Sequence, residues 1–563
     1  MRVALALTLC CLSACKKDPA ASTVAAAPAR PKLAEPTAQW LKGELPAAAL
    51  EGSPTDGGTL TVRIHVEPAG LNRLHDQMVE GTMVHYTMGP LYETLAAIDP
   101  ETAPRYELKP VLAESWSESA DHLTLTVKLR KGVKFHDGQG FSAKDVKAVV
   151  DAMMDPKNPV ASVRSYFVDL DKVTTPDDST VVVKWKKPYF QSTKNFLASL
   201  PMIPASALKG NFDELSINRH PVGTGPFKFV SWEAGKAITY ERNESYWGPK
   251  PHLSKVVLRF VKDETVASEL WQRGEFDLMT HIEPSVWRAI EAATPENQWA
   301  ITQYNRIFWA ENSYSYIGWN EERPLFQDVR VRRALAMLFP FEQVEKNVDM
   351  GLEQATTCMY YELSRSCDPG VKRLPYDPAA AVALLKEAGW ADHDGDGWLD
   401  KDGAHFKFSL LINVHSVRLG KLAPMFQEEL KKAGIEMTVE RIDPTQLIPR
   451  MRAHDFDAAP MQWANADPQW DQFQTYHSSQ AKEGSDWVSY KNPQVDALLE
   501  KIRVEFDPDK RVQLEQQVHR TLYQEQPYLY LTHRPALDAA KTRVHGLKPA
   551  ITWYDLSKVW VDP

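Results

Sequence analysis

The chain has 563 residues, which is too long for one hydrophobic core at roughly 100–200 residues per domain, so we expect two or three domains. Its 43% hydrophobic and 25% charged residues are ordinary for a globular protein and exclude a disordered chain, a collagen-like repeat and a polytopic membrane protein. The formal net charge is −9 with no basic block, which makes nucleic acid a poor candidate for a partner. The 17 tryptophans indicate either large cores or a cleft that grips a ligand.

The N-terminus predicts export. After Arg2, an apolar run from Val3 to Leu12 is too short to span a bilayer but suits the core of a signal peptide. The run leads into Ser13-Ala14-Cys15, which resembles the bacterial lipobox, so we expect a signal peptide over 1–14 and a lipidated Cys15. A plain secretory signal is the alternative. Residues 15–57 are rich in Ala, Pro, Lys and Glu and would form a tether outside the cytoplasm.

Two cysteines remain in the expected mature chain. Cys358 and Cys367 are nine positions apart, and an even pair in an exported protein indicates a disulfide, with two free thiols as the alternative. A loop this short would stabilise the fold by roughly 2–3 kcal/mol.

Strand and helix signals alternate after residue 58. Runs of alternating or β-branched residues predict strands at 59–64, 123–129, 180–185 and 255–260. Ser142 with Asp145, and Asp377 with Pro378, have the spacing of helix N-termini, and the second helix would end at Gly389. A third helix is predicted over 328–338, where we expect Arg330, Arg332 and Arg333 to form a solvated face. The class is therefore α/β or α+β.

Motifs for catalysis are missing from the sequence. It contains no Gly-x-Ser-x-Gly, no His-Glu-x-x-His and no phosphate-binding loop, so an enzyme is disfavoured, and no cofactor is expected.

One segment imitates a Ca²⁺-binding loop. Asp392, Asp394, Asp396 and Asp400 occupy positions 1, 3, 5 and 9 of an EF-hand loop, but position 12 is Gly403 where a bidentate Glu is required. We therefore expect an acidic turn and no resident metal, with Ca²⁺ as the weaker alternative.

A series of motifs resembles one protein family, the family 5 extracellular solute-binding proteins of ABC importers, over about residues 58–560. The motifs are Leu91-Tyr-Glu-Thr-Leu95, Leu112-Ala-Glu-Ser-Trp116, Leu129-Arg-Lys-Gly-Val-Lys-Phe-His-Asp-Gly138, Phe141-Ser-Ala-Lys-Asp-Val146, Val222-Gly-Thr-Gly-Pro-Phe227, Tyr246-Trp247, Phe326 to Leu335, Tyr376 to Gly389 and Asn492-Pro-Gln-Val-Asp496. Each motif alone is weak evidence, and the resemblance rests on the order in which the motifs follow one another along the chain.

The resemblance implies a periplasmic-binding-protein-like type II fold of cluster C, with two lobes joined by a two-stranded hinge and an extra subdomain. The expected boundaries are 58–92, 201–320 and 536–563 for lobe I, 93–200 for the extra subdomain and 321–535 for lobe II. Trp116 and Trp247 lie inside fold motifs and are expected in the core.

The resemblance also implies a ligand cleft between the lobes. Trp463 matches a cleft tryptophan of the family. The stretch after it is shorter than in the family, so Asp467 matches the acidic residue beside a proline, and Asn465 would take the place of the Asp that binds a peptide's amino end. This departure makes recognition of a free amino terminus doubtful. Further expected ligand contacts are Trp470, Tyr316, Asn320, Glu67 and Asn72, and Trp319 is also expected near the cleft.

The predicted function is a membrane-anchored monomer that captures peptides or peptide-like solutes for an ABC permease and its ATPases. The alternatives are a non-peptide solute, such as a glycoside, an opine-like compound, a peptide antibiotic or a metal chelate, or a signalling or chaperone role without transport.

Overall fold

We describe the protein from a computed structural model, which describes residues 53–78, 84–99, 102, 106–292, 304–310, 312–361, 364–464, 467, 469–482, 484–547 and 554–562. The expected signal peptide, Cys15, most of the tether and Asn465 lie outside the described residues. Within these ranges, no helix has the length and apolar character needed to cross a membrane.

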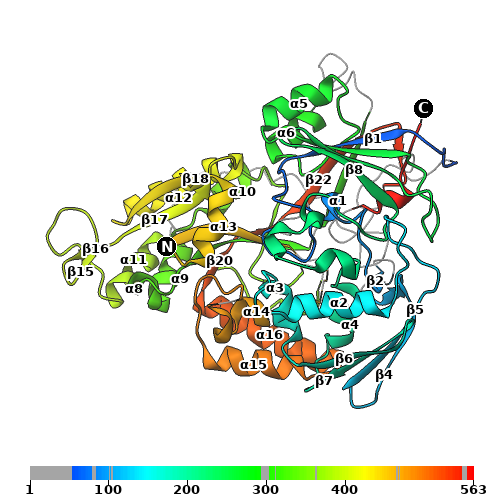
Figure 1. Ribbon diagram of the computed structural model, residues 1–563. Helices are drawn as coiled ribbons and strands as arrows, with labels where there is room; N and C mark the ends of the chain where they lie inside the picture. The colour runs from blue at the N-terminus through cyan, green and yellow to red at the C-terminus, as the bar shows by residue number, and fades with distance from the viewer. Residues whose placement is uncertain are drawn as a thin grey trace, which may run out of the picture.

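A seven-stranded sheet forms the first structural unit, which we call lobe I (Figure 1). Its strands, in spatial order, are β12 (Tyr304–Ala310), β22 (Pro535–Lys541), β11 (Leu278–Met279), β1 (Thr59–Ile64), β10 (Lys255–Phe260), β9 (Ala237–Arg242) and β8 (Phe227–Glu233). Helices α5 (Glu264–Gln272) and α6 (Pro284–Glu291) accompany it. The central strand β1 pairs in parallel with β10 and β11, so segments far apart in sequence meet at its C-terminal end.

A four-stranded antiparallel sheet forms a second unit, which we call the subdomain. Its strands are β4 (Ala113–Glu118), β5 (Thr124–Leu129), β7 (Thr180–Trp185) and β6 (Leu170–Asp177), with helices α2 (Ala143–Met154), α3 (Ala161–Arg164) and α4 (Ser192–Ala198). The two-stranded ribbon of β2 (Ala96–Ile98) and β3 (Leu108–Pro110) lies between it and lobe I in the chain. One hydrophobic core contains Leu60 and Val62 of lobe I together with Val127 and Val183 of the subdomain, so these two units pack as one body.

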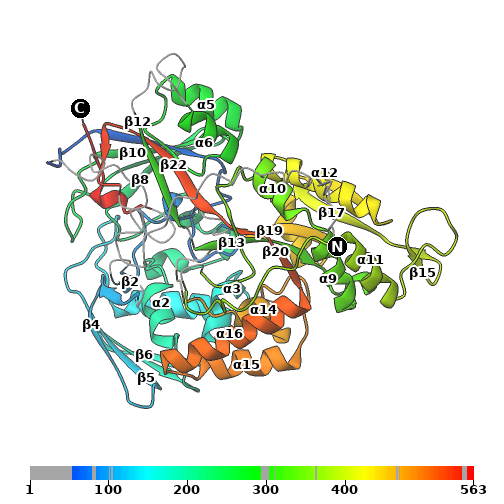
Figure 2. The ribbon, with the colours of Figure 1, turned by 180° about the vertical axis from the view of Figure 1, so that it is seen from behind.

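A five-stranded sheet forms the third unit, lobe II. Its strands are β18 (Glu436–Ile442), β17 (Lys407–Asn413), β19 (Ala458–Ala464), β13 (Ser313–Trp319) and β20 (Tyr528–Tyr530). Its helices are α8 (Pro324–Gln327), α9 (Val329–Leu338), α10 (Phe341–Asn347), α11 (Pro378–Glu387), α12 (Val417–Lys432), α13 (Pro444–Arg452), α14 (Phe473–Tyr476), α15 (Pro493–Arg503) and α16 (Pro508–Glu525). The chain enters lobe II between β12 and β13 and returns between β20 and β22 (Figure 2).

Short elements complete the fold. They are α1 (Val84–Thr87), the pairs β14 (Gln354–Ala355) with β21 (Thr532–His533), β15 (Asp400–Lys401) with β16 (Ala404–His405) and β23 (Val544–His545) with β24 (Trp560–Val561), and 3₁₀ turns at Ser165–Phe167, Ala205–Leu208, Phe212–Glu214, Ser216–Asn218, Ser478–Gln480 and Leu556–Lys558.

The strongest strand and helix-start signals of the sequence are confirmed. The strands predicted at 59–64, 180–185 and 255–260 form with those bounds, and the strand predicted at 123–129 begins one residue later. Ser142 and Asp145 form a reciprocal capping box at the start of α2, and the Asp377 side chain accepts from the backbone N–H of Ala380 at the start of α11. Each satisfies backbone N–H groups that a helix start leaves unpaired.

The prediction that Arg332 lies on a solvated face of α9 is wrong. Its side chain is buried, with Nη1 3.1 Å from a Glu321 carboxylate oxygen and Nε donating to the Glu525 carbonyl at 2.9 Å. Arg330 keeps the expected exposed position and pairs with Asp328. Arg332 can be buried because these acceptors, which come from other segments, satisfy the N–H donors of its guanidinium, and the helix periodicity carries no information about them.

The turn before β8 needs its two glycines for space. A Cβ at Gly223 would lie 2.0 Å from the Leu91 carbonyl oxygen, and one at Gly225 would lie 2.5 Å from the Pro90 carbonyl oxygen. These glycines therefore allow the close approach of two backbone segments, and β8 begins directly after them.

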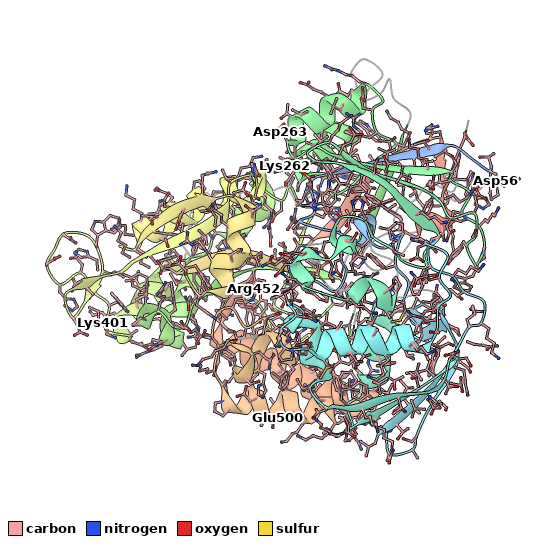
Figure 3. The ribbon with its side chains drawn as sticks, viewed as in Figure 1. Asp56, Lys262, Asp263, Lys401, Arg452 and Glu500 are labelled. Atoms are coloured by element: carbon pink, nitrogen blue, oxygen red, sulfur yellow. A yellow bond between two sulfur atoms is a disulfide. The ribbon has the colours of Figure 1, made fainter. Side chains whose placement is uncertain are left out.

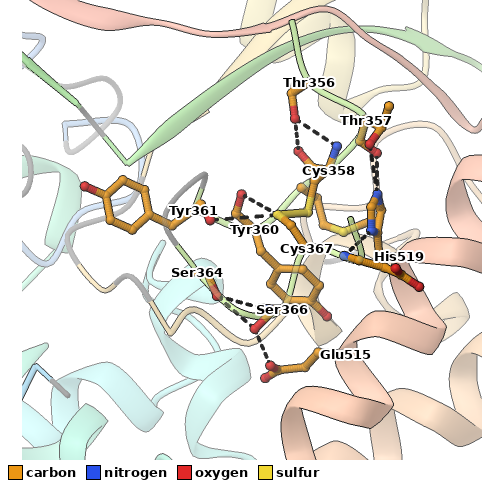
Figure 4. The surroundings of a disulfide bond; sticks show 12 residues. Thr356, Thr357, Cys358, Tyr360, Tyr361, Ser364, Ser366, Cys367, Glu515 and His519 are labelled. Atoms are coloured by element: carbon orange, nitrogen blue, oxygen red, sulfur yellow. Dashed lines mark hydrogen bonds between the residues drawn. A yellow bond between two sulfur atoms is a disulfide. The ribbon is translucent and has the colours of Figure 1, made fainter. Parts of the chain in front are cut away.

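Cys358 and Cys367 are joined by a disulfide within a loop of lobe II, and hydrogen bonds hold this loop against α16 (Figure 4). The Asp368 N–H donates to His519 Nδ1 at 3.0 Å, and His519 Nε2 lies 2.8 Å from the Thr357 carbonyl oxygen. Burial of the ring lowers the pKa of His519 to about 4, although the hydrogen bond to the Thr357 carbonyl oxygen opposes this fall.

Candidate functional site

The candidate site lies where lobe II meets the subdomain. A pocket of about 140 Å³ is lined by Asp76 of the segment after β1, by Ser162 of the subdomain, and from the lobe II side by Arg452, Lys482 and Trp487. Figure 3 shows Arg452 at this junction. A direct hydrogen bond beside the pocket, from Gln474 Nε2 to the Ser162 carbonyl at 3.0 Å, holds the two sides together.

Three tryptophans form one aromatic wall of the junction. The Trp463 ring centroid lies 5.0 Å from that of Trp487 and 5.7 Å from that of Trp470. Trp463 and Trp470 are half-buried. The indole N–H of Trp470 donates to the Tyr166 hydroxyl of the subdomain at 2.6 Å, so the wall touches both units. Such a wall offers apolar area with polar edges, which suits a ligand of mixed character.

Strand β19 carries Trp463 and leaves part of one edge open. On one side, residues 458–464 pair with β13 along the whole strand. On the other side, the described part of the chain pairs β19 with β17 only at Ala458 and Leu410. The backbone of residues 461–464 is therefore placed to accept an extended segment as an added strand.

Asp467 follows the aromatic wall and is paired within the protein. Its carboxylate lies 2.7 Å from Lys194 Nζ, and the two side chains are only 15% and 13% exposed. The same oxygen accepts the Gln469 N–H at 2.9 Å. Lys194 belongs to α4 of the subdomain, so this ion pair crosses the junction. Asp467 also faces Tyr106, whose phenol pKa is raised by burial and by this negative charge.

Asp471 is the second acidic residue of the segment and lies deeper. It is 2% exposed, accepts the Tyr189 hydroxyl of the subdomain at 2.8 Å and lies 3.2 Å from Arg503 Nε. The Arg503 guanidinium lies over the Tyr189 ring, 4.2 Å from its centroid. Burial raises the pKa of Asp471, and Arg503 opposes that rise. This group of three side chains locks the subdomain against lobe II.

Three predicted ligand residues lie inside the protein. Tyr316 is 1% exposed and stacks on Tyr528 with ring centroids 3.8 Å apart. Asn320 is fully buried and donates to the carbonyl oxygens of His454 and Phe456, and Asn72 is fully buried and donates to Asn218. Their polar groups serve the fold here, and their roles as ligand contacts stay predictions.

Glu67 and Trp319 also have structural partners. Glu67 accepts the Trp232 indole N–H at 2.8 Å and the Gly235 N–H at 3.0 Å, both within lobe I. Trp319, expected near the cleft, is instead fully buried in the core of lobe II and stacks on Phe326. Trp116 and Trp247 are only partly buried, and they pack against the core of lobe I and the subdomain.

A cluster of buried ion pairs near the strands that connect the lobes was not predicted from the sequence. Arg418 Nε lies 2.7 Å from Asp349, Arg418 Nη2 lies 3.0 Å from Glu353, and Arg534 Nε lies 2.8 Å from Glu353. Although burial works against ionisation of Glu353, Arg418 and Arg534 hold its pKa below the usual range. The four residues come from segments up to 185 positions apart, so no local pattern could have linked them.

The Asp-rich turn brings its carboxylates together without a complete ligand set. Asp392, Asp394 and Asp400 each offer an oxygen within 4.8 Å of the others. The carboxylate of Asp392 already accepts the backbone N–H groups of Gly395 and Gly397, which is the geometry of an acidic turn. Ca²⁺ binding at Asp392, Asp394, Asp396 and Asp400 stays the weaker prediction.

Comparison with known proteins gives consistent matches. Residues 107–485 match the family model described as bacterial extracellular solute-binding proteins, family 5 Middle. The chain is 31% identical over 523 residues to the oligopeptide-binding protein AppA of Bacillus subtilis, covering 91% of this chain and 93% of that one.

Solved structures agree. The structure of AppA from Bacillus subtilis in complex with a nonapeptide has a TM-score of 0.83 at 29% identity and covers 91% of this chain and 100% of that one. NikZ from Campylobacter jejuni in complex with Ni(L-His) has a TM-score of 0.78 at 25% identity and covers 89% of this chain and 99% of that one.

Proposed function

The chain belongs to family 5 of the bacterial extracellular solute-binding proteins, and we propose that it captures a peptide or peptide-like solute between lobe II and the body formed by lobe I and the subdomain. It is a binding protein and not an enzyme, as the names of its relatives state. Its likeness to solved family members confirms the expected type II fold with two lobes.

The observation that carries the proposal is the open edge of β19 beside the tryptophan wall. Residues 461–464 are placed to pair with an extended backbone, while Trp463, Trp470 and Trp487 supply area for side chains. Backbone pairing binds peptides of many sequences, because every peptide presents the same N–H and C=O groups. A nonapeptide is the bound ligand in the AppA structure.

The role in transport is part of the same proposal. A ligand that touches both lobes stabilises the closed form by its higher affinity for that form. The closed monomer would dock on an ABC permease whose ATPase partners supply the energy. A lipid on Cys15 would keep the protein on the outer face of a membrane, within reach of that permease.

A small metal chelate is the second candidate ligand, since the NikZ structure contains Ni(L-His). The extent of the aromatic wall and of the open strand edge favours the peptide, because a small chelate would use little of either.

A thermal-shift screen tests the proposal. A mixed pool of nonapeptides at about 100 times its Kd should stabilise the protein by roughly 2.7 kcal/mol, and Ni(L-His) serves as the competing ligand. Trp463→Ala should reduce the shift caused by peptides. The matched control is Trp398→Ala, in the Asp-rich turn at the far end of lobe II, which should leave that shift unchanged. A shift with the chelate but not with peptides contradicts the proposal.

A further inference from the structure

A peptide with a free amino end would bring an ammonium group into the junction. Burying a cation without a carboxylate costs several kcal/mol, so a site that selects free amino ends needs an available carboxylate. The segment from Met461 to Gln474, which carries Trp463 and Trp470, supplies two carboxylates, Asp467 and Asp471. Beside Trp487, the fully buried Asp486 accepts the Tyr490 backbone N–H at 3.2 Å.

Asp467 already holds an ammonium group. Lys194 Nζ lies 2.7 Å from its carboxylate and 3.2 Å from the Gln469 side-chain oxygen, which is ordinary ammonium coordination. Arg511 provides a second positive charge that is attracted to Asp467. The charge of Asp467 is thus matched by cations of the chain itself.

The carboxylate of Asp471 is also fully occupied by partners within the protein. It accepts hydrogen bonds from the Tyr189 hydroxyl and the Phe473 N–H and pairs with Arg503, and it is 2% exposed. A ligand ammonium would have to displace the guanidinium of Arg503, which is itself 8% exposed and lies over two aromatic rings.

Two other carboxylates near the junction also have partners. Asp76, which lines the pocket, accepts the Ala161 N–H at 2.7 Å and the Ser162 hydroxyl. Glu353 pairs with Arg418 and Arg534. Beside them, Arg452 and Lys482 of the pocket add positive charge, which disfavours a further cation.

We propose that Lys194 determines ligand specificity by serving as a built-in ammonium on Asp467, so that the closed protein binds peptides and peptide-like solutes whose amino end is blocked or absent. This inference rests on the proposed function. Lys194 comes from the subdomain and Asp467 from lobe II, so their pairing also closes the junction without help from a ligand's charge.

The test uses two nonapeptide libraries that differ only in N-terminal acetylation, with affinities measured by calorimetric titration. We expect the wild-type protein to bind acetylated peptides within about threefold of the free ones, or more tightly. Lys194→Met leaves Asp467 available, so free peptides should gain about tenfold over acetylated ones, the value of one charge-assisted hydrogen bond.

Three variants make the comparison specific. Lys194→Arg keeps a cation and should keep the wild-type ratio of affinities. Lys187→Met removes an exposed lysine of the same segment and should also keep that ratio. Lys194→Gln should act like Lys194→Met and provides a second, polar variant if the apolar one misfolds.

Two results would overturn the inference and leave the proposed function standing. One is a wild-type protein that loses tenfold or more in affinity on acetylation. The other is an unchanged ratio in both Lys194→Met and Lys194→Gln. Absence of binding to either library in every variant would instead overturn the proposed function, and the inference with it.

Discussion

Glu321 shows how burial controls a single charge in this protein. It follows β13 and lies 3.1 Å from Arg332, whose guanidinium also donates to the Phe326 and Glu525 carbonyl oxygens. Burial raises the pKa of Glu321 to about 8, against the attraction of Arg332. Because the folded pKa exceeds the unfolded value, the resulting stabilisation is complete below about pH 4.5 and is lost as pH rises through about 8.

Glu321→Gln should therefore change the pH dependence of stability. At pH 5 both side chains are neutral, and the melting temperatures of variant and wild type should nearly coincide. Between pH 5 and pH 9 the wild type should lose stability relative to the variant, by a few degrees of melting temperature. The control, Glu428→Gln at an exposed position of α12, should follow the wild type. Parallel profiles for Glu321→Gln and wild type would show that Glu321 ionises normally.

At the scale of single elements, the sequence predicted the strands and helix starts that depend on residues close together along the chain. Side-chain alternation located β1 and β7, and the caps at Ser142 and Asp377 located two helix starts, because these signals act within a few residues. The burial of Arg332 was not predictable in this way, since its partner Glu525 lies 193 positions away. The depth of Trp319 likewise depends on Phe408 of β17, with which it packs edge to face.

The disulfide loop against α16 gives a prediction for one element. Reduction should destabilise the protein by roughly 2–3 kcal/mol, because a short loop is released in the unfolded chain. The fold should survive, since the His519 ring and the hydrogen bond from Ser366 to Glu515, at 2.5 Å, still hold the loop. Urea unfolding with and without reductant measures this effect.

The double variant Cys358→Ser with Cys367→Ser is the control for that experiment. It should match the reduced wild type and should not respond to reductant. Equal unfolding midpoints for the oxidised and reduced wild-type protein would contradict the stabilising role of the disulfide.

At the scale of the whole molecule, the junction is built from pairs that no local pattern links. Tyr189 and Asp471 are 282 positions apart, and Lys194 and Asp467 are 273 apart. The sequence could nominate Trp463, Trp470 and Asp467 through the family resemblance. It could not reveal that Asp467 is occupied by Lys194, because that depends on how α4 approaches lobe II.

Tyr189→Phe tests the contact between the subdomain and lobe II. The variant leaves a buried carboxylate without its hydroxyl donor, which costs about 1.5–3 kcal/mol. Because the donor belongs to the other side of the junction, we expect the closed form to weaken and peptides to dissociate about tenfold faster in stopped-flow measurements.

Tyr376→Phe is the matched control, since it removes a hydroxyl donated to Glu429 entirely within lobe II. It should leave the dissociation rate unchanged. If Tyr189→Phe and Tyr376→Phe dissociate at the wild-type rate, the contact at Tyr189 does not hold the lobes closed.

The most direct test of the central claim is native mass spectrometry of the full chain mixed with a nonapeptide pool and a non-peptide solute pool that contains Ni(L-His). The account predicts one added mass per chain, and fragmentation of the isolated complex should give peptide sequences. Complexes formed only with the non-peptide pool, in the presence of excess peptide, would contradict the claim that the lobes close on a peptide.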